Sequence, residues 1–372
     1  MDEHGDRTSA LVERLFQDAA GALELYTVYL GERLGLYRAL AEGGPATSAE
    51  LAEHTGTTER YVREWLEHHA SSGILDVDDP AAAPLERRYR LPPEHVPVLA
   101  DPDDVHYEAY RGVEIVRAAR PLPDLLEAFR NGGAPAPLAW EPEGRAEPNR
   151  ALFLQLLGTE WLPAIPEVDG RLRADPPARV ADAGCGAGWS SIGMAMAYPT
   201  ITVDGFDLDA EVIATARRHA EESGVADRVR FWVGDASRST GAPPRGSPDP
   251  SDPGLSGRYD LVTILEALHD MPRPVQALQR ARAMLAEGGS VLVADELVGD
   301  QFAAPGPETE RYHYGWSVVD CLPAVMGDPM TSATGAVMRP ATLRGYATQA
   351  GFRRVEVLPF ETRFLRFYRL LP

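Results

Sequence analysis

The ten residues VADAGCGAGW, from Val180 to Trp189, run from a predicted buried strand through a turn with three glycines into a predicted helix. Glycine adopts backbone angles closed to other residues, so a ligand can lie against bare main chain at the positive end of the helix. We therefore expect a nucleotide-like ligand. A dinucleotide site would need Gly-x-Gly-x-x-Gly, but Gly188 follows Gly186 after a single residue. No Gly-Lys-Ser/Thr follows, which argues against a phosphate-binding loop.

Two further strand ends carry residues that suit a nucleoside. In GFDLD, residues 205–209, Asp207 can accept hydrogen bonds from both ribose hydroxyls, and Leu208 can pack on the base. The alternative is that Asp207 only caps the helix beginning near Ala210. The third strand end reads VGDA, residues 233–236, so three successive strands end in ligand-type residues.

Residues 182–188 resemble the Asp-x-Gly-x-Gly-x-Gly motif of class I S-adenosylmethionine-dependent methyltransferases. Through the three strand-end motifs the likeness covers about residues 175–372. It implies S-adenosylmethionine as the cofactor, with the adenine edge held at the third strand end. On this basis the cofactor-binding residues are expected to be Asp182, Gly184, Gly186, Gly188, Asp207, Leu208, Asp235, Ala236 and Glu266.

Short apolar strands alternate with helices from Ala178 onward, which is typical of a parallel sheet with helical crossovers. We predict an α/β, doubly wound, Rossmann-like seven-stranded sheet with an antiparallel last strand. A stretch rich in Pro, Gly and Ser at 237–257 is expected to be a mobile surface insertion. Strands are expected at 179–183, 201–206, 229–233, 259–265, 290–295, 355–360 and 364–370.

The N-terminal part predicts a mainly helical winged-helix domain, with a capping box at Thr47 and Glu50. Residues 73–75 and 87–91 are expected to pair as a hairpin. Over residues 20–95 this order is similar to the winged-helix dimerisation module of natural-product and plant O-methyltransferases, which implies a homodimer. Helices are expected at 11–42, 49–54 and 58–71.

A winged helix usually indicates DNA binding, and a DNA-binding regulator that senses S-adenosylmethionine is one alternative function. The chain, however, carries a net charge of −20, and the predicted helix at 58–71 has Glu59, Glu64 and Glu67 against two arginines. Nucleic-acid affinity rests largely on basic side chains that neutralise phosphates. We therefore expect no nucleic-acid partner.

Three parts are predicted: a winged-helix dimerisation domain at 1–95, a helical connector and lid at 96–170, and a cofactor-binding domain at 171–372. No stretch reaches the roughly 18 apolar residues of a membrane helix, and the N-terminus lacks signal-peptide features. We expect a cytoplasmic protein with no membrane partner. Two cysteines, Cys185 and Cys321, argue against a disulfide framework or a cysteine-based zinc site, so no metal is expected.

The fourth predicted strand ends in LEALHDM, residues 265–271. Ligands of open parallel sheets bind outside the carboxyl ends of the strands, so chemistry is expected here. The segment resembles that of plant-type small-molecule O-methyltransferases, in which a His-Asp pair supplies the general base, and His269 is the candidate base. Met271 stands where the family commonly has Trp, which weakens the case for an oxygen acceptor. Alternatively, His269 packs at a helix start, and Glu266 is a solvated helix-start acid.

An aromatic-rich stretch, RYHYGWS at 311–317, lies where the family places its acceptor lid. His313, Tyr314 and Trp316 are expected substrate contacts; the alternative is that these rings belong to the core. No histidine partner for Cys321 is visible in the sequence, so a buried apolar thiol is expected. The favoured function is methyl transfer to a hydroxyl, amine or carbon of a small molecule. A non-methylating enzyme that uses the same pocket for cyclisation or decarboxylation is the other enzymatic alternative.

Overall fold

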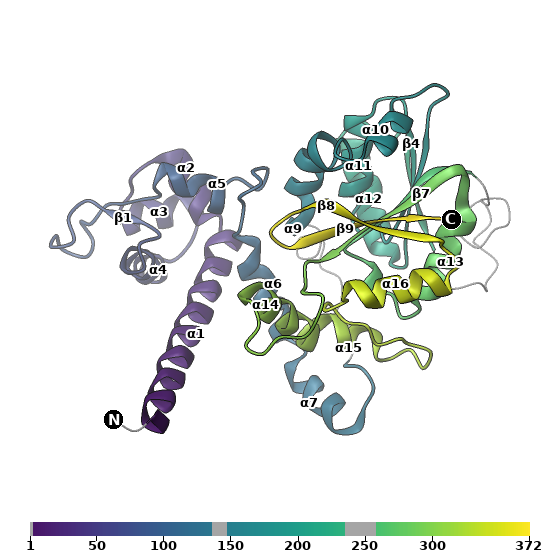
Figure 1. Ribbon diagram of the computed structural model, residues 1–372. Helices are drawn as coiled ribbons and strands as arrows, with labels where there is room; N and C mark the ends of the chain where they lie inside the picture. The colour runs from purple at the N-terminus through teal and green to yellow at the C-terminus, as the bar shows by residue number, and fades with distance from the viewer. Residues whose placement is uncertain (1–2, 136–146, 235–257) are drawn as a thin grey trace. The chain divides into compact units, whose positions relative to one another are not determined.

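The computed structural model describes residues 3–135, 147–234 and 258–372 (Figure 1). The chain forms two compact units that divide between Arg117 and Ala118. Residues 96–117 belong to the first unit and residues 118–170 to the second. The three-part division at 95 and 170 stays a prediction, and the predicted insertion at 237–257 lies outside the described residues. Within the described residues, no helix is long and apolar enough to cross a membrane.

The N-terminal unit is mainly helical. The predicted capping box is confirmed, because Thr47 accepts a hydrogen bond from the amide of Glu50 and the Glu50 carboxylate accepts one from the amide of Thr47. Apolar side chains from its helices, such as Leu40, Leu51 and Leu66, meet in one core. Its elements, the last of which crosses the boundary, are α1 (Glu3–Arg33), α2 (Leu36–Gly43), α3 (Ser48–Thr55), α4 (Glu59–Ser71), β1 (Asp76–Val77), β2 (Tyr89–Arg90), η1 (Pro93–His95), α5 (Val96–Leu99) and α6 (Tyr110–Ala119).

The hairpin pairs β1 with β2 in antiparallel fashion, with Val77 opposite Tyr89. Its first arm lies further along the chain than the predicted 73–75. Gly73 adopts a φ of +79°, and the amides of Ile74 and Leu75 donate to the carbonyl of His69 at 2.9 and 3.1 Å. These residues therefore close the carboxyl end of α4 and are not available for strand pairing.

The C-terminal unit is built on a seven-stranded sheet in the order β5-β4-β3-β6-β7-β9-β8. The first five of these strands are parallel, and β9 runs antiparallel to β7 and to β8, which confirms the predicted fold class. The strand order reverses at β3, where a ligand crevice is expected. The strands are β3 (Arg179–Ala183), β4 (Thr202–Asp207), β5 (Val229–Val233), β6 (Tyr259–Leu265), β7 (Leu285–Glu296), β8 (Arg354–Glu361) and β9 (Leu365–Leu371).

Helices cover both faces of this sheet. Alternate residues of β3 point to opposite faces, so Val180 belongs to one core with Ile192 and Ile213, whereas Ala181 belongs to another with Leu278 and Leu343. The helical elements are α7 (Leu122–Asn131), α9 (Glu147–Leu152), η2 (Phe153–Trp161), α10 (Pro166–Leu172), α11 (Trp189–Ala197), α12 (Ala210–Glu222), η4 (Leu268–Asp270), α13 (Pro274–Met284), α14 (Glu308–Trp316), η5 (Ser317–Cys321), α15 (Leu322–Val325) and α16 (Pro340–Gln349).

The segment before the sheet packs closely on α11. A Cβ added at Gly158 would lie 2.0 Å from the Cβ of Ala197, and one at Gly193 would lie 2.3 Å from the carbonyl oxygen of Phe153. Both glycines are therefore needed for η2 to approach α11. The segment is helical from α9 through η2, and it winds with wider turns over η2.

Candidate functional site

The glycine turn between β3 and α11 has the conformation that its sequence predicts. Gly184, Gly186 and Gly188 adopt φ values of +76°, +52° and +89°, in the region that favours glycine. A Cβ at Gly184 would lie 2.6 Å from the Cβ of Ala267, whereas no described atom lies within 4 Å of one at Gly186. The turn thus packs against the β6 end at Gly184 and leaves space at Gly186.

Asp182 lies beneath this turn and is 1% exposed. Its carboxylate accepts hydrogen bonds from the hydroxyls of Ser190, Ser191 and Thr263 at 2.6, 2.7 and 2.7 Å. Burial raises the pKa of Asp182, and the three hydroxyls act against that rise. These contacts fix the start of α11 to β3 and β6. A direct contact of Asp182 with a cofactor stays a prediction.

Asp207 connects the second strand end to the glycine turn. Its carboxylate accepts hydrogen bonds from the amide of Gly186 at 3.0 Å and from the amide of Asp209 at 3.1 Å. Asp209, and not Asp207, caps α12 by accepting from the amides of Glu211 and Val212, so the capping alternative for Asp207 is wrong. Leu208 is 61% exposed, an apolar side chain at the strand end.

The third strand end lies next to the second, because the amide of Gly234 donates to the carbonyl of Asp207 at 2.8 Å. The next two predicted cofactor contacts, Asp235 and Ala236, lie outside the described residues. Their part in the site stays a prediction.

Glu266 occupies a strained position directly after β6. Its φ is +51°, unusual for a residue with a side chain, and its amide donates to the carbonyl of Ala294 at 2.8 Å. The Glu266 carboxylate accepts a hydrogen bond from the side chain of Asn149, which belongs to α9. Strain of this kind persists where the surroundings hold it and clusters at functional sites.

His269 and Asp295 form a buried pair next to Glu266. The Nδ1 atom of His269 lies 3.0 Å from Asp295 Oδ1, and the two residues are 3% and 1% exposed. The amide of Glu296 donates to the same Oδ1 at 3.0 Å. On the other side of the ring, Nε2 lies 3.5 Å from the carboxylate of Asp270, whose side chain is about half exposed. Asp295 therefore holds Nδ1, and Nε2 faces the half-exposed carboxylate of Asp270.

Acidic groups dominate the electrostatics of this site. Burial alone would lower the pKa of His269, but the carboxylates of Asp295 and Asp270 raise it well above the ordinary value. Burial raises the pKa of Glu266 to about 7 and that of Glu296 well above its usual range. The carboxylates of this site form an acidic cluster around His269, and such a cluster suits a ligand with positive charge.

Helix α14 contributes one of its three predicted substrate residues to this cluster. His313 is 2% exposed, and its Nδ1 lies 3.4 Å from the carboxylate of Glu296. Burial, followed by the charge of His269, lowers the pKa of His313 to about 4. Tyr314 points elsewhere, since its hydroxyl accepts a hydrogen bond from Arg339 at 3.1 Å. Trp316 is half-buried and packs against Tyr312 with ring centroids 6.1 Å apart.

Cys321 is brought to His269 by the helical segment that follows α14. The sulfur of Cys321 lies within 4.8 Å of a ring nitrogen of His269, and burial followed by the charge of Asp270 raises the pKa of the thiol to about 12. The expectation of an apolar thiol without a histidine neighbour is therefore wrong. The predicted site also lacks three residues that the structure brings to it: Asn149, Asp295 and Glu296. The two acids end β7, so the rule that ligands bind at strand ends could have found them.

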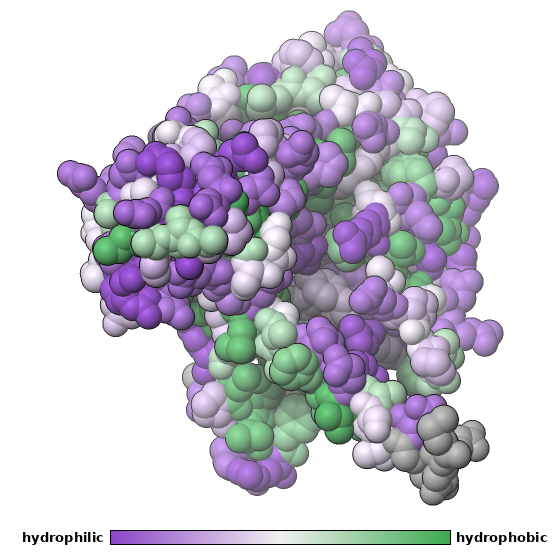
Figure 2. All heavy atoms as spheres, turned by 90° about the vertical axis from the view of Figure 1, so that its left-hand side faces the viewer, coloured by the Kyte–Doolittle hydropathy of each residue, from purple (hydrophilic) through white to green (hydrophobic). Residues whose placement is uncertain are grey.

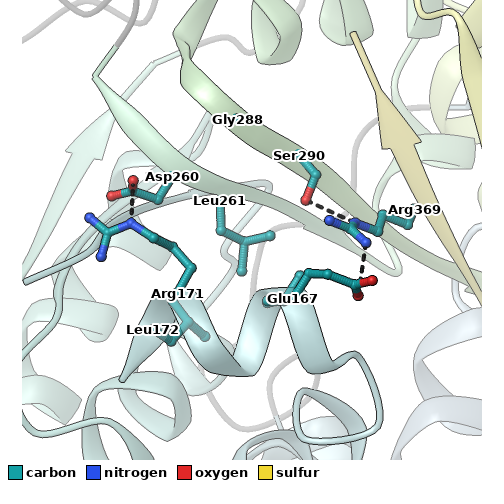
Figure 3. A pocket seen from close by; sticks show the side chains of 9 residues that line it. Glu167, Arg171, Leu172, Asp260, Leu261, Gly288, Ser290 and Arg369 are labelled. Atoms are coloured by element: carbon teal, nitrogen blue, oxygen red, sulfur yellow. Dashed lines mark hydrogen bonds and ion pairs between the residues drawn. The ribbon is translucent and has the colours of Figure 1, made fainter. Parts of the chain in front are cut away.

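A cleft at the other end of the sheet differs from this site (Figure 3). Its volume of about 20 Å³ has room for roughly one water molecule. Its two arginines are paired with acids: Arg171 Nε lies 2.8 Å from Asp260 and Arg369 lies 3.1 Å from Glu167 (Figure 3). These ion pairs attach α10 to the sheet, and we assign the cleft a structural role.

Comparisons with known families place two domains along the chain. Residues 21–101 match the Rv2258c-like winged HTH domain, and residues 174–320 match a methyltransferase domain. The ubiquinone biosynthesis O-methyltransferase of Marinobacter nauticus is 32% identical over 117 residues, 31% of this chain and 43% of that protein. The corresponding protein of Bordetella avium is 32% identical over 152 residues, 41% of this chain and 53% of that protein. The chain thus spans about half the length of these curated relatives.

Solved structures extend the likeness over nearly the whole chain. The mitomycin 7-O-methyltransferase MmcR is 21% identical, with 99% of each chain covered and a TM-score of 0.66. Human N-acetylserotonin methyltransferase, solved in complex with SAM, is 20% identical, with 97% of each chain covered and a TM-score of 0.67. At these identities the likeness shows the fold alone.

Proposed function

We propose that this chain, which carries a winged-helix domain followed by a methyltransferase domain, transfers the methyl group of S-adenosylmethionine to a small-molecule acceptor, most favourably to a hydroxyl. The observation that carries the proposal is the buried His269–Asp295 pair beside the glycine turn. Neighbours in fold that were solved with this cofactor or its demethylated product support the choice of cofactor.

The residues around the turn fit this cofactor. Gly186 leaves space for a ligand against main chain, Asp207 offers a carboxylate, and Leu208 offers an exposed apolar side chain for a base. Gly184 and Gly188 shape the turn, and Glu266 belongs to the acidic cluster around His269. When bound, S-adenosylmethionine supplies a methyl group on a positively charged sulfur, and the buried acids favour that charge.

The protein's part in the reaction is alignment and proton removal. Nε2 of His269 accepts the proton of the acceptor hydroxyl, while Asp295 fixes the ring through Nδ1 and stabilises the imidazolium that forms. Alignment of the reacting groups contributes several kcal/mol and a positioned base roughly a hundredfold or more. His313 supplies a polar wall to the acceptor. Contacts of Trp316 and Tyr314 with the acceptor stay predictions.

A second copy of the chain is the proposed partner of α1. This helix exposes apolar side chains along its length, and the face on which it lies carries hydrophobic patches (Figure 2). Such a long apolar stripe is stabilised by burial against another surface. The exposed residues include Leu11 at 47%, Val12 at 64%, Leu15 at 57%, Phe16 at 65% and Leu23 at 61%.

Five arginines of the winged helix are paired with acids, which supports the proposal that this module does not bind nucleic acid. Arg60 lies 2.5 Å from Glu64, and Arg87 lies 2.7 Å from Glu67. Phosphate contacts would have to compete with these pairs. Further pairs join Arg63 with Glu59, Arg88 with Glu50 and Arg90 with Asp76. A cytoplasmic location stays a prediction.

The test has two steps. Calorimetry of the full chain with S-adenosylmethionine and with S-adenosylhomocysteine should give binding of both, and uptake of neither would overturn the proposal. Incubation with a panel of phenols and alcohols should then give one S-adenosylhomocysteine for each methylated product. Conversion of a substrate without release of S-adenosylhomocysteine would assign the pocket to the non-methylating alternative.

A further inference from the structure

We propose that His269, Asp270 and Cys321 form a binding site for a borderline-soft divalent metal ion such as Zn²⁺ or Co²⁺. One ligand atom from each side chain lies within 4.8 Å of the other two. The three come from two separate segments, since η4 provides the histidine and the carboxylate and the end of η5 provides the sulfur. The fold therefore assembles a nitrogen, an oxygen and a sulfur at one place.

The donor set indicates the class of metal. Imidazole nitrogen and thiolate sulfur suit zinc and cobalt, whereas magnesium and calcium prefer oxygen ligands alone. The composition of the chain argues against a zinc site built from cysteines, but this site needs only one sulfur. Three protein ligands leave a fourth tetrahedral position open to water.

Asp295 supplies the support that a histidine ligand needs. Metal-binding histidines commonly donate their second ring N–H to a carboxylate, which fixes the tautomer and the ring orientation. Here Nδ1 of His269 lies 3.0 Å from Asp295 Oδ1, so Nε2 is left to bind the ion. That nitrogen lies 3.5 Å from Asp270 Oδ1.

A small movement completes the coordination sphere. With Zn–N near 2.0 Å and Zn–S near 2.3 Å, tetrahedral ligands lie about 3.5 Å apart, which is the distance already present between Nε2 of His269 and Oδ1 of Asp270. The sulfur of Cys321 lies within 4.8 Å of the other two ligand atoms, so it has to approach them by about 1 Å at most. The exposed carboxylate also gives the ion a path from solvent.

Metal binding has a consequence that rests on the proposed function. An ion on Nε2 of His269 occupies the lone pair that would accept the proton of the acceptor. Zn²⁺ should therefore lower the rate of S-adenosylhomocysteine formation in proportion to the fraction of protein that carries metal, and a chelator should restore the rate. Zinc binding without inhibition would count against His269 as the base and leave the metal site in place.

The site itself is tested without any acceptor by titrating Co²⁺ into the full-length chain and recording its absorption spectrum. A thiolate ligand gives a near-ultraviolet charge-transfer band, and a tetrahedral site gives intense visible bands. Cys321→Ser should lose the charge-transfer band and bind Zn²⁺ at least about tenfold more weakly by calorimetry. Cys185→Ser is the matched control, because it removes the chain's other cysteine, and it should keep both.

Two results would overturn the site: a wild-type chain that shows neither the band nor heat of Zn²⁺ binding, and a band that persists in Cys321→Ser. If Cys321→Ser fails to fold, Asp270→Asn replaces it, since this half-exposed side chain can be changed without disturbing the core. Asp270→Asn should keep the charge-transfer band and lose affinity. Unchanged affinity in that variant would remove the carboxylate from the site and reject the three-ligand assignment.

Discussion

Nδ1 of His269 lies 3.0 Å from Oδ1 of Asp295, and both residues are almost completely buried although they come from different elements. A buried imidazole beside a buried carboxylate is oriented and kept ready to take up a proton. The pair lies where β6 and β7 end, at the edge of the sheet that also carries the glycine turn. The proposed chemistry therefore depends on a carboxylate that is far from His269 in the sequence.

The first prediction concerns this carboxylate. Asp295→Asn should lower kcat by about a hundredfold or more and leave the affinity for S-adenosylmethionine within about threefold, because it removes the charge that holds the imidazolium. Steady-state rates check the change in kcat, and calorimetry checks the affinity for S-adenosylmethionine. Glu287→Gln, an exposed acid of the same strand, is the control. Full turnover by Asp295→Asn would show that the pair is only structural.

The second prediction concerns cofactor affinity. Asp207→Asn should weaken binding of S-adenosylhomocysteine roughly tenfold to a hundredfold, since it removes a charged acceptor that also anchors the amide of Gly186. Calorimetry measures this loss. Asp227→Asn, whose side chain is 74% exposed on the loop before β5, should bind like the wild type. Equal affinities in the two variants would show that the ligand does not bind at the end of β4.

A third prediction separates backbone strain from steric conflict at glycine. Gly184→Ala and Gly224→Ala both place a side chain at positive φ, which costs about 1–2 kcal/mol. Only Gly184→Ala also brings the new Cβ within 2.6 Å of Ala267. Urea unfolding should therefore show a larger decrease in the free energy of unfolding for Gly184→Ala, and this variant should also lose cofactor binding. Similar losses in the two variants would contradict the close approach of the turn to Ala267.

The fourth prediction is a pH dependence of stability in the N-terminal unit. Burial, and then the charge of His68, lowers the pKa of His69 from 6.5 to about 4 in the folded chain. Between these values the unfolded state binds the proton and the folded state does not, so stability is present above pH 6.5 and is lost as the pH falls towards 4. At pH 5 the loss from this residue is about 2 kcal/mol.

Urea unfolding at pH 7 and pH 5 checks this value. His69→Leu should show a pH dependence about 2 kcal/mol smaller than that of the wild type. His54→Gln, an exposed histidine on α3, should keep the wild-type dependence. If His69→Leu keeps the wild-type difference in stability between pH 7 and pH 5, other groups cause the acid sensitivity.

The fifth prediction concerns assembly. Phe16→Glu places a charge in the exposed apolar stripe of α1 and should convert the proposed dimer to a monomer, as measured by light scattering after gel filtration. Gln17→Glu adds a charge to the same helix beside the stripe and should leave the dimer intact. A wild-type chain that is monomeric at micromolar concentration would reject the proposed interface.

The sheet could be predicted from sequence because its signals are local. Buried strands such as β3 and β6 are short and mostly apolar, and the glycines of the turn mark where β3 ends. The hairpin of the winged helix was harder, since Gly73 can either begin a strand or end a helix. Its position is decided by the hydrogen bonds that Ile74 and Leu75 make to His69.

The candidate site could be predicted only in part. Asp207 ends β4 and His269 lies four residues after the end of β6, so the rule that ligands bind at strand ends finds them. The same rule would have found Asp295 and Glu296. Asn149 and Cys321 reach the site through helices packed from other parts of the chain, and spacing along the sequence says nothing about such contacts.

The hydroxyl groups around Asp182 bear on how a ligand associates. Because three internal donors already bind that carboxylate, the neighbouring main chain is preorganised before any ligand arrives. Ligand binding then orders little additional backbone next to Asp182. The conformational entropy that a flexible loop would lose on binding is already lost here during folding.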